Sequence, residues 1–304
     1  MGQHDSARTV RVLIGLVVGI TIASGGIAGD VERLWMPETF PGLVRAMELG
    51  IAQSLTPAER VVLAEGTKEA LRETHPQLHA KISRSYVRWT DEWIRRNKRE
   101  LASVPQRHIR RAEQSVADVD TRLRAYFGSR GWTYRPLQVV FVPQHLMAEP
   151  GLPSISARGM YVLFYPDVFF TALGPDATMR HTLIHEGLHF NKTGPGLGRT
   201  LAEGIAEAAA TRLALEWGVV RKGTLRQANY YPRELQAVDY ILDRMIERTG
   251  IRREQALEIL LHTYLTGDST EIEAIFGTAA WSEIVRASRG PGKLRKIAKR
   301  VLGS

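Results

Sequence analysis

His185, Glu186 and His189 form an H-E-x-x-H pattern, in the run His185-Glu186-Gly187-Leu188-His189. On a helix, residues four apart lie on one face, so His185 and His189 can direct two imidazoles at one metal ion. Glu186 follows the first histidine directly, where its carboxylate can accept a proton from a metal-bound water. The spacing therefore predicts a zinc site that activates water, and Zn²⁺ is the expected cofactor.

The pattern needs a helix, and the sequence predicts one over residues 177–190. This stretch contains no proline, and Asp176, directly before it, is a favourable N-cap residue. Three side chains supply an apolar face, Leu183, Ile184 and Leu188. We therefore expect both histidines of the pattern on one helix.

A further histidine, His181, lies one turn before His185 on the same predicted helix face. One turn along the axis, it is badly placed to share the metal ion. We expect it either beside the ligands, where it would orient them, or facing solvent.

A third ligand must follow, and the sequence offers few candidates. Residues 191–202 contain no Asp, Glu, His or Cys, and Pro195 occupies the position at which metzincins place a histidine. The first available side chains are Glu203 and Glu207, in a helix-forming run that begins at Thr200. Two histidines and one carboxylate, with a fourth position for water, form a known catalytic zinc set. Glu203 also fits a Thr200-x-x-Glu203 capping box, and if capping were its only task, Glu207 would be the ligand.

With Glu203-Gly204-Ile205-Ala206-Glu207 following the H-E-x-x-H pattern, the chain resembles the gluzincins, and among them the peptidase-MA-like and collagenase-like zinc metallopeptidases. The resemblance covers about residues 119–304. It implies that Glu203 is the third ligand and that Glu207 supports the ligands or the structure. It also implies an α+β, zincin-like fold, with a small mixed sheet, an active-site helix and a helical C-terminal subdomain after a helical N-terminal segment.

The resemblance also implies an activity, which is hydrolysis of peptide bonds in a peptide or protein substrate with Glu186 as general base. Gluzincins often stabilise the oxyanion with a Tyr or His downstream of the third ligand. The candidates are Tyr230, Tyr231, Tyr240, His262 and Tyr264. The resemblance favours Tyr231, whose alternative role is packing beside Pro232. Two other functions stay open: a metal-free pseudo-peptidase that acts as an envelope scaffold, and a zinc hydrolase of a non-peptide amide.

Composition limits the chemistry further. The chain of 304 residues has no cysteine, which excludes disulfides, thiolate metal sites and a cysteine nucleophile. Its formal net charge is +9, with Lys and Arg spread along the chain. This charge fits an ordinary basic protein, and alternatively attraction to anionic surfaces or acidic substrates. No nucleic-acid-binding module of a known kind is present, so we expect no nucleic-acid partner.

The N-terminus predicts export from the cytoplasm. Residues 12–29 carry no charged side chain and follow Arg8 and Arg11. This pattern is typical of a cleaved signal peptide or of an uncleaved signal anchor in the membrane, and both place the remaining chain outside the cytoplasm. A buried core helix is the third reading.

We expect residues 30–106 to be a helical N-terminal segment, which could serve as a prodomain, a partner-binding unit or a lid. Thr56, Pro57 and Glu59 predict a helix start with a capping box. An aromatic stripe at helical spacing predicts a core face, with an interaction face as the alternative; it consists of Tyr86, Trp89 and Trp93.

The catalytic domain is expected over residues 107–290. Its predicted elements are a helix over 107–127, a buried strand over 137–142, an edge strand over 159–165, and helices over 232–248, 253–266 and 269–276. The resemblance implies that the edge strand borders the active site, where a substrate peptide could pair with it. Residues 291–304 are expected to form a basic tail, with a loosely attached helix that could contact a membrane surface or simply fray.

Overall fold

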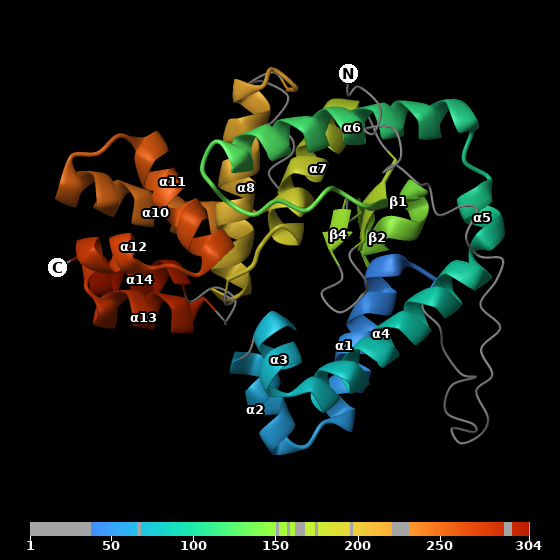
Figure 1. Ribbon diagram of the computed structural model, residues 1–304, viewed down its shortest axis with the longest axis horizontal. Helices are drawn as coiled ribbons and strands as arrows, with labels where there is room; N and C mark the ends of the chain where they lie inside the picture. Colours follow the sequence, from blue (N-terminus) through green and yellow to red (C-terminus); the bar gives the residue numbers. More distant parts are fainter. Residues whose placement is uncertain are drawn as a thin grey trace, which may run out of the picture. The chain divides into compact units, whose positions relative to one another are not determined.

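The computed structural model describes residues 38–65, 68–149, 152–156, 159–161, 168–173, 176–194, 197–220, 231–288 and 294–303. Helices dominate this part of the chain, and a small mixed sheet accompanies them (Figure 1). The α+β class is therefore compatible with the structure. Contacts group the chain into two compact units, one of residues 1–62 and 70–179, the other of 63–69 and 180–304. The predicted domain boundaries stay a prediction.

The predicted signal peptide or anchor, residues 12–29, lies outside the described residues. Among the helices that the structure does describe, none combines the length and the apolar character that crossing a membrane requires.

The N-terminal segment is helical from Phe40 onward, as predicted. Its helices, and the one that follows, are α1 Phe40–Ser54, α2 Pro57–Glu65, α3 Lys68–Thr74, α4 Pro76–Arg96, α5 Lys98–Ala102 and α6 Gln106–Gly128. The helix predicted over residues 107–127 corresponds to α6.

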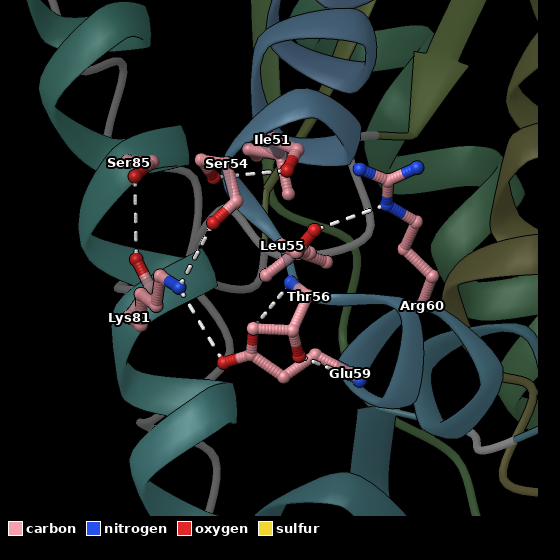
Figure 2. A network of polar contacts seen from close by, with 8 residues as sticks. All are labelled: Ile51, Ser54, Leu55, Thr56, Glu59, Arg60, Lys81 and Ser85. Atoms are coloured by element: carbon pink, nitrogen blue, oxygen red, sulfur yellow. Dashed lines mark hydrogen bonds and ion pairs between the residues drawn. The ribbon is translucent and has the colours of Figure 1, made fainter.

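The start of α2 has the predicted capping box, and a network of polar contacts ties it to its neighbours (Figure 2). The Thr56 N–H donates to Glu59 Oε2 at 2.7 Å, and the Glu59 N–H donates to Thr56 Oγ1 at 3.2 Å. The ammonium of Lys81 on α4 donates to the Ser54 carbonyl at 3.2 Å and to Glu59 Oε1 at 3.4 Å. The backbone hydrogen bond from Thr56 is the main reason why the pKa of Glu59 is lowered. One carboxylate thus caps α2 and joins it to α4.

The aromatic stripe of α4 faces the core, as predicted. Tyr86 and Trp93 are buried, while Trp89 is half-buried. Phe40 of α1 lies between two aromatic partners, with its ring centroid 5.0 Å from that of Trp93 and 4.0 Å from that of Phe170. The Trp93 indole N–H donates to the Glu38 carbonyl at 3.2 Å. These contacts anchor α1 and α4 to the strand that carries Phe170.

The sheet has the order β1-β5-β4, with β1 Val139–Val142, β4 Gly159–Tyr161 and β5 Phe169–Ala172. β1 pairs with β5 in parallel, and β4 pairs with β5 in antiparallel orientation. The predicted strands over 137–142 and 159–165 are present as β1 and β4, and β4 lies at an edge of the sheet, as predicted. The prediction that the first strand is buried is wrong, because β1 lies at the other edge and three of its four residues are only half-buried. Residues 162–165 of the second prediction lie outside the described residues.

Several elements were not predicted. The central strand β5 is only four residues long and ends shortly before the helix that carries the H-E-x-x-H pattern. Its apolar residues are therefore easily taken for the segment that leads into that helix. A short 3-10 helix, η1 Gln144–Met147, precedes a hairpin of β2 Ala148–Glu149 and β3 Leu152–Ser156. Strands this short carry too little alternation to be recognised from sequence.

In the part that the structure describes, the regular elements of the second unit are helices. It contains α7 Asp176–Phe190 from residue 180 on, then α8 Arg199–Glu216, α10 Pro232–Thr249, α11 Arg253–Thr266, α12 Thr270–Phe276, α13 Thr278–Ala287 and α14 Leu294–Leu302. The predicted helices over 177–190, 232–248, 253–266 and 269–276 are confirmed within about a turn. Asp176, predicted as N-cap, is instead the first residue of α7.

The C-terminal tail is not loosely attached, which corrects the prediction for its described part. Helix α14 buries Leu294, Ala298 and Leu302 and packs against α10 and α13. These residues recur every four positions, so one face of the helix is apolar while the basic residues lie on the exposed face. Burial of that apolar face outweighs the tendency of a terminal helix to fray.

In the first unit, one side chain on α6 fixes the chain that leads into β1. Asp120 Oδ1 accepts hydrogen bonds from the Tyr134 hydroxyl at 2.6 Å and from the Leu137 N–H at 2.7 Å. Burial and the bond to Asp120 raise the pKa of Tyr134, so the phenol stays a donor. The remaining oxygen, Oδ2, lies 3.1 Å from Nη2 of the exposed Arg124.

We expect Asp120→Ala to lower the free energy of unfolding by about 2 kcal/mol, because two part-buried donors lose their acceptor. Arg124→Ala is the control, since it removes an ion pair and a cation–π contact that an exposed arginine makes, and should cost less than about 1 kcal/mol. Urea unfolding of the full chain measures both. Equal losses in the two variants would contradict the anchoring role of Asp120.

Candidate metal centre

His185, His189 and Glu203 converge at the point where α7 faces α8. His185 Nε2 lies 3.0 Å from His189 Nε2 and 3.2 Å from Glu203 Oε2. His189 Nε2 lies 3.3 Å from the same Glu203 oxygen. The helix predicted from the pattern therefore brings both imidazoles to one point, and the second helix adds one carboxylate oxygen.

This donor set fits a zinc ion in both chemistry and size. Zinc bound at about 2.0–2.1 Å in tetrahedral geometry separates its ligand atoms by about 3.3–3.4 Å. The three observed separations, 3.0, 3.2 and 3.3 Å, are close to one face of such a tetrahedron. In the described part of the chain, these three residues form the group of His and acidic side chains that could hold a metal. They would leave a fourth position for water.

The geometry favours Glu203 over Glu207 as the carboxylate that faces the two Nε2 atoms. Glu207 Oε2 instead lies 3.1 Å from His185 Nδ1, on the opposite side of that ring. Glu207 is also more deeply buried, with 3% of its side chain exposed against 19% for Glu203. One turn of α8 thus separates a residue in front of His185 from a residue behind it.

The predicted capping box at Thr200 is wrong. Helix α8 begins at Arg199 with Gly198 as N-cap, and Thr200 lies inside its first turn. Gly198 has a φ of 81°, in the left-handed region that glycine reaches without strain, and it has no side chain that could cap the helix. Because the helix starts earlier than expected, Glu203 has no capping role, and its position among the metal-facing atoms has no competing explanation from capping.

His181 lies behind the cluster and does not face solvent. Its side chain is buried, and Nε2 lies 3.3 Å from Thr211 Oγ1 and 3.7 Å from Glu207 Oε1. Of the two expectations for His181, the position beside the ligands agrees with the structure. Glu207 therefore has a histidine on each of its two oxygens, His181 on one and His185 on the other.

Mutual charge interactions dominate the protonation of the cluster. Burial alone would lower the pKa of His185, but the carboxylates of Glu203, Glu207 and Glu186 outweigh it and raise the pKa well above its ordinary value. Burial would raise the pKa of Glu203, yet His189 and His185 hold it well below its usual range. The charges of His185 and Glu203 therefore stabilise each other in the buried cluster.

Two further predicted residues lie close to these atoms. Glu186 is buried, with 7% of its surface exposed, and its charge acts on both His185 and Tyr231. The Tyr231 ring stacks on His185, with centroids 5.6 Å apart and planes 3° from parallel. Burial, followed by the charges of Glu203 and Glu186, raises the pKa of Tyr231, so its hydroxyl keeps its proton.

The other tyrosine and histidine candidates have different surroundings. Tyr264 contacts His189 by a hydrogen bond between its hydroxyl and Nδ1. Tyr240 lies beside Arg244, whose guanidinium is 5.5 Å from the ring centroid. His262 acts on Asp268, whose pKa it helps to lower. Tyr230 lies outside the described residues.

The glycine of the Glu203-to-Glu207 run allows a close helix contact that the sequence did not reveal. A Cβ at Gly204 would lie 2.7 Å from Val238 Cγ2 and 2.8 Å from the Glu234 carbonyl oxygen of α10. Real Cβ atoms do not approach backbone so closely, so only glycine lets α8 pack here against α10. This contact determines how closely α8 packs against α10, and therefore where Glu203 and Glu207 lie.

Comparison of the chain with protein-family models, with curated proteins and with solved structures found no match. The likeness of the two motifs to gluzincins therefore stays a prediction.

We expect Gly204→Ala to destabilise the protein by about 1–3 kcal/mol, because the added methyl group meets backbone that cannot move aside. Thermal unfolding of the full chain measures the change. Gly128→Ala is the matched control, since a Cβ there would have no neighbour within 4 Å. Equal unfolding temperatures for the Gly204 variant and the parent would refute the close contact.

Proposed function

We propose that this protein is a zinc-dependent metallopeptidase of gluzincin kind, zincin-like in fold, with His185, His189 and Glu203 as zinc ligands. The observation that carries the proposal is the triangle of two imidazole nitrogens and one carboxylate oxygen, with sides of 3.0–3.3 Å. Two motif helices supply these atoms, and the donor set is one that catalytic zinc sites use.

Zinc, when bound, lowers the pKa of a coordinated water and polarises the carbonyl that is attacked. Glu186 acts as general base and accepts the proton of that water. The same carboxyl group then gives the proton to the leaving amine. Its burial next to His185 supports this role, because a base works best where few solvent molecules compete for the proton.

Tyr231 is proposed to stabilise the oxyanion. Its hydroxyl donates a hydrogen bond as charge develops on the carbonyl oxygen of the substrate. The stacking on His185 holds the ring beside the cluster, and the raised pKa keeps the phenol protonated. Packing beside Pro232 is the alternative role, and it predicts no kinetic effect of removing the hydroxyl.

The proposed substrate is a peptide or protein that the enzyme meets outside the cytoplasm. The uncharged run over residues 12–29, after Arg8 and Arg11, supports a signal peptide or membrane anchor. Pairing of a substrate strand with β4 stays a prediction, as does contact of the basic C-terminal helix with a membrane surface. Neither a nucleic acid nor a second cofactor is part of the proposal.

Two other functions make different predictions. A hydrolase of a non-peptide amide would bind zinc and need Glu186, but would leave peptides intact. A pseudo-peptidase scaffold would bind no zinc, and the joint presence of His185, His189, Glu186 and Glu203 argues against it. A panel of peptide and cell-wall amide substrates separates the first alternative from the proposal, and metal analysis separates the second.

Metal analysis of the full chain is expected to find about one zinc per molecule. Glu203→Ala should remove it, because the site loses the carboxylate that faces both Nε2 atoms. Glu207→Ala should keep a zinc site with affinity lowered about 10- to 100-fold, because that carboxylate contacts His181 and the Nδ1 side of His185 but not the two Nε2 atoms. Zinc lost solely with Glu207→Ala would reassign the ligand, and no zinc in the parent would overturn the proposal.

Kinetics of the zinc-loaded chain are expected to separate the role of Glu186 as general base from that of Tyr231 at the oxyanion. Glu186→Gln should bind zinc normally and lose activity by at least about 10²-fold, since the amide cannot accept the proton. Tyr231→Phe should lower kcat about 10²-fold with little change in KM, because the hydroxyl acts in the transition state. Full activity of Glu186→Gln on every substrate would contradict the mechanism, and an unchanged Tyr231→Phe enzyme would leave that residue a packing role.

A further inference from the structure

Tyr264 on α11 contacts the nitrogen of His189 that faces away from the metal-facing cluster. Its hydroxyl is hydrogen-bonded to His189 Nδ1, and the two rings meet edge to face at 5.8 Å and 88°. His189 Nε2 lies on the other side, 3.0 Å from His185 Nε2. We propose that Tyr264 is a positioning residue for the metal: it holds the His189 ring and the proton on Nδ1, so that Nε2 is free to bind. This inference rests on the proposed zinc site.

The two metal-facing histidines are supported by groups of different chemistry. Glu207 Oε2 lies 3.1 Å from His185 Nδ1, a charge contact whose geometry is not that of a hydrogen bond. Because a carboxylate offers only acceptor oxygens, its charge favours a proton on that nitrogen. The Tyr264 phenol can accept from His189 Nδ1 or donate to it. The charge of Glu207 therefore favours Nε2 of His185 as the metal-binding nitrogen, whereas His189 keeps its partner in either neutral tautomer.

This difference has a consequence for metal binding. A neutral imidazole that binds a metal through Nε2 carries its ring proton on Nδ1. The Tyr264 oxygen can then accept a hydrogen bond from that N–H. Without the phenol oxygen, that N–H would lose the partner that the structure gives it, at a place covered by a side chain that is 1% exposed. The metal-bound form would then carry the cost of an unpaired buried donor.

Backbone contacts fix the position of Tyr264 relative to the end of α7. The Thr193 and Gly194 N–H groups both donate to the carbonyl of Leu265, the next residue after Tyr264, at 2.8 and 2.9 Å. The Thr193 hydroxyl donates to the same carbonyl at 3.1 Å. Gly194 also lies so close to α11 that an added Cβ would meet Gly267 N at 2.1 Å. The last turn of α11 is thus clamped to the residues that follow the metal-facing histidines.

Lys192 adds a further contact to the same tyrosine. Its ammonium lies 5.5 Å from the centroid of the Tyr264 ring, within the range of a cation–π interaction. The ring is therefore held by the hydrogen bonds to the neighbouring Leu265 carbonyl, by Lys192 and by His189. A side chain held in this way has little freedom to turn its hydroxyl elsewhere, which is what a positioning role requires.

The test compares the full chain with Tyr264→Phe, and with Tyr240→Phe as a matched control that removes a hydroxyl from α10. Zinc affinity is measured by competition with a chromophoric chelator, and the visible spectrum of the cobalt-loaded protein reads the ligand geometry. We expect Tyr264→Phe to weaken zinc about 10- to 100-fold and to shift the cobalt bands. Tyr240→Phe should change neither.

Each outcome decides a different question. Zinc affinity within about twofold of the parent, with an unchanged cobalt spectrum, would overturn the role of Tyr264 and leave the proposed function standing. A parent chain that binds no zinc would overturn the proposed function and this inference together. If Tyr264→Phe does not fold, nitrogen NMR of the zinc-loaded parent replaces it: a His189 ring protonated on Nδ1 supports the inference, and one that binds zinc through Nδ1 overturns it.

Discussion

The contact between His185 and two carboxylates is the interaction on which the described site depends. A buried imidazole has Glu203 on its Nε2 side and Glu207 on its Nδ1 side. Isolated ionised groups would be costly to bury, and the opposite charges make the burial acceptable. Because both carboxylates come from α8, the pairing also fixes how α8 faces α7. The contacts that join α7 and α8 are thus the same ones that bring together three side chains that could hold a metal.

The remainder of the second unit holds α8 in this position. Gly204 lets α8 approach the backbone of α10, and Leu201, Ile205 and Leu213 are buried in the surrounding helices. The chain between the two motifs is clamped at both ends. Thr193 and Gly194 bind the Leu265 carbonyl, while the Thr200 N–H donates to the Ser288 carbonyl at 3.2 Å. The C-terminal helices therefore act on the site through backbone contacts, although the three side chains that could hold a metal come from α7 and α8.

Much of this arrangement could be predicted from sequence, because local spacing determines it. The histidines four residues apart, the carboxylates four residues apart on α8 and the helices that end at Gly250 and near Gly218 all follow from the helical repeat and from glycine. Glu207 is predicted to support the ligands or the structure, and His181 either to lie beside the ligands or to face solvent; in the structure both lie beside the cluster. The start of α8 was misplaced because Thr200 fits a capping pattern, whereas the helix begins one residue after Gly198, whose left-handed conformation the sequence does not disclose.

The sequence does not predict contacts between residues that are far apart in the chain. From the sequence, Tyr264 is a candidate only for stabilising the oxyanion. Its hydrogen bond with His189 depends on the backbone hydrogen bonds between the chain after α7 and α11, which no local pattern reveals. The short strand β5 and the burial of α14 depend in the same way on tertiary packing.

The most direct measurement is a crystal structure of the zinc-soaked protein with anomalous data at the zinc absorption edge. The account predicts one strong peak bonded to His185 Nε2, His189 Nε2 and a Glu203 oxygen, with Glu207 still on His185 Nδ1. A zinc peak bonded to Glu207 instead, or no peak at this cluster at full zinc concentration, would contradict it.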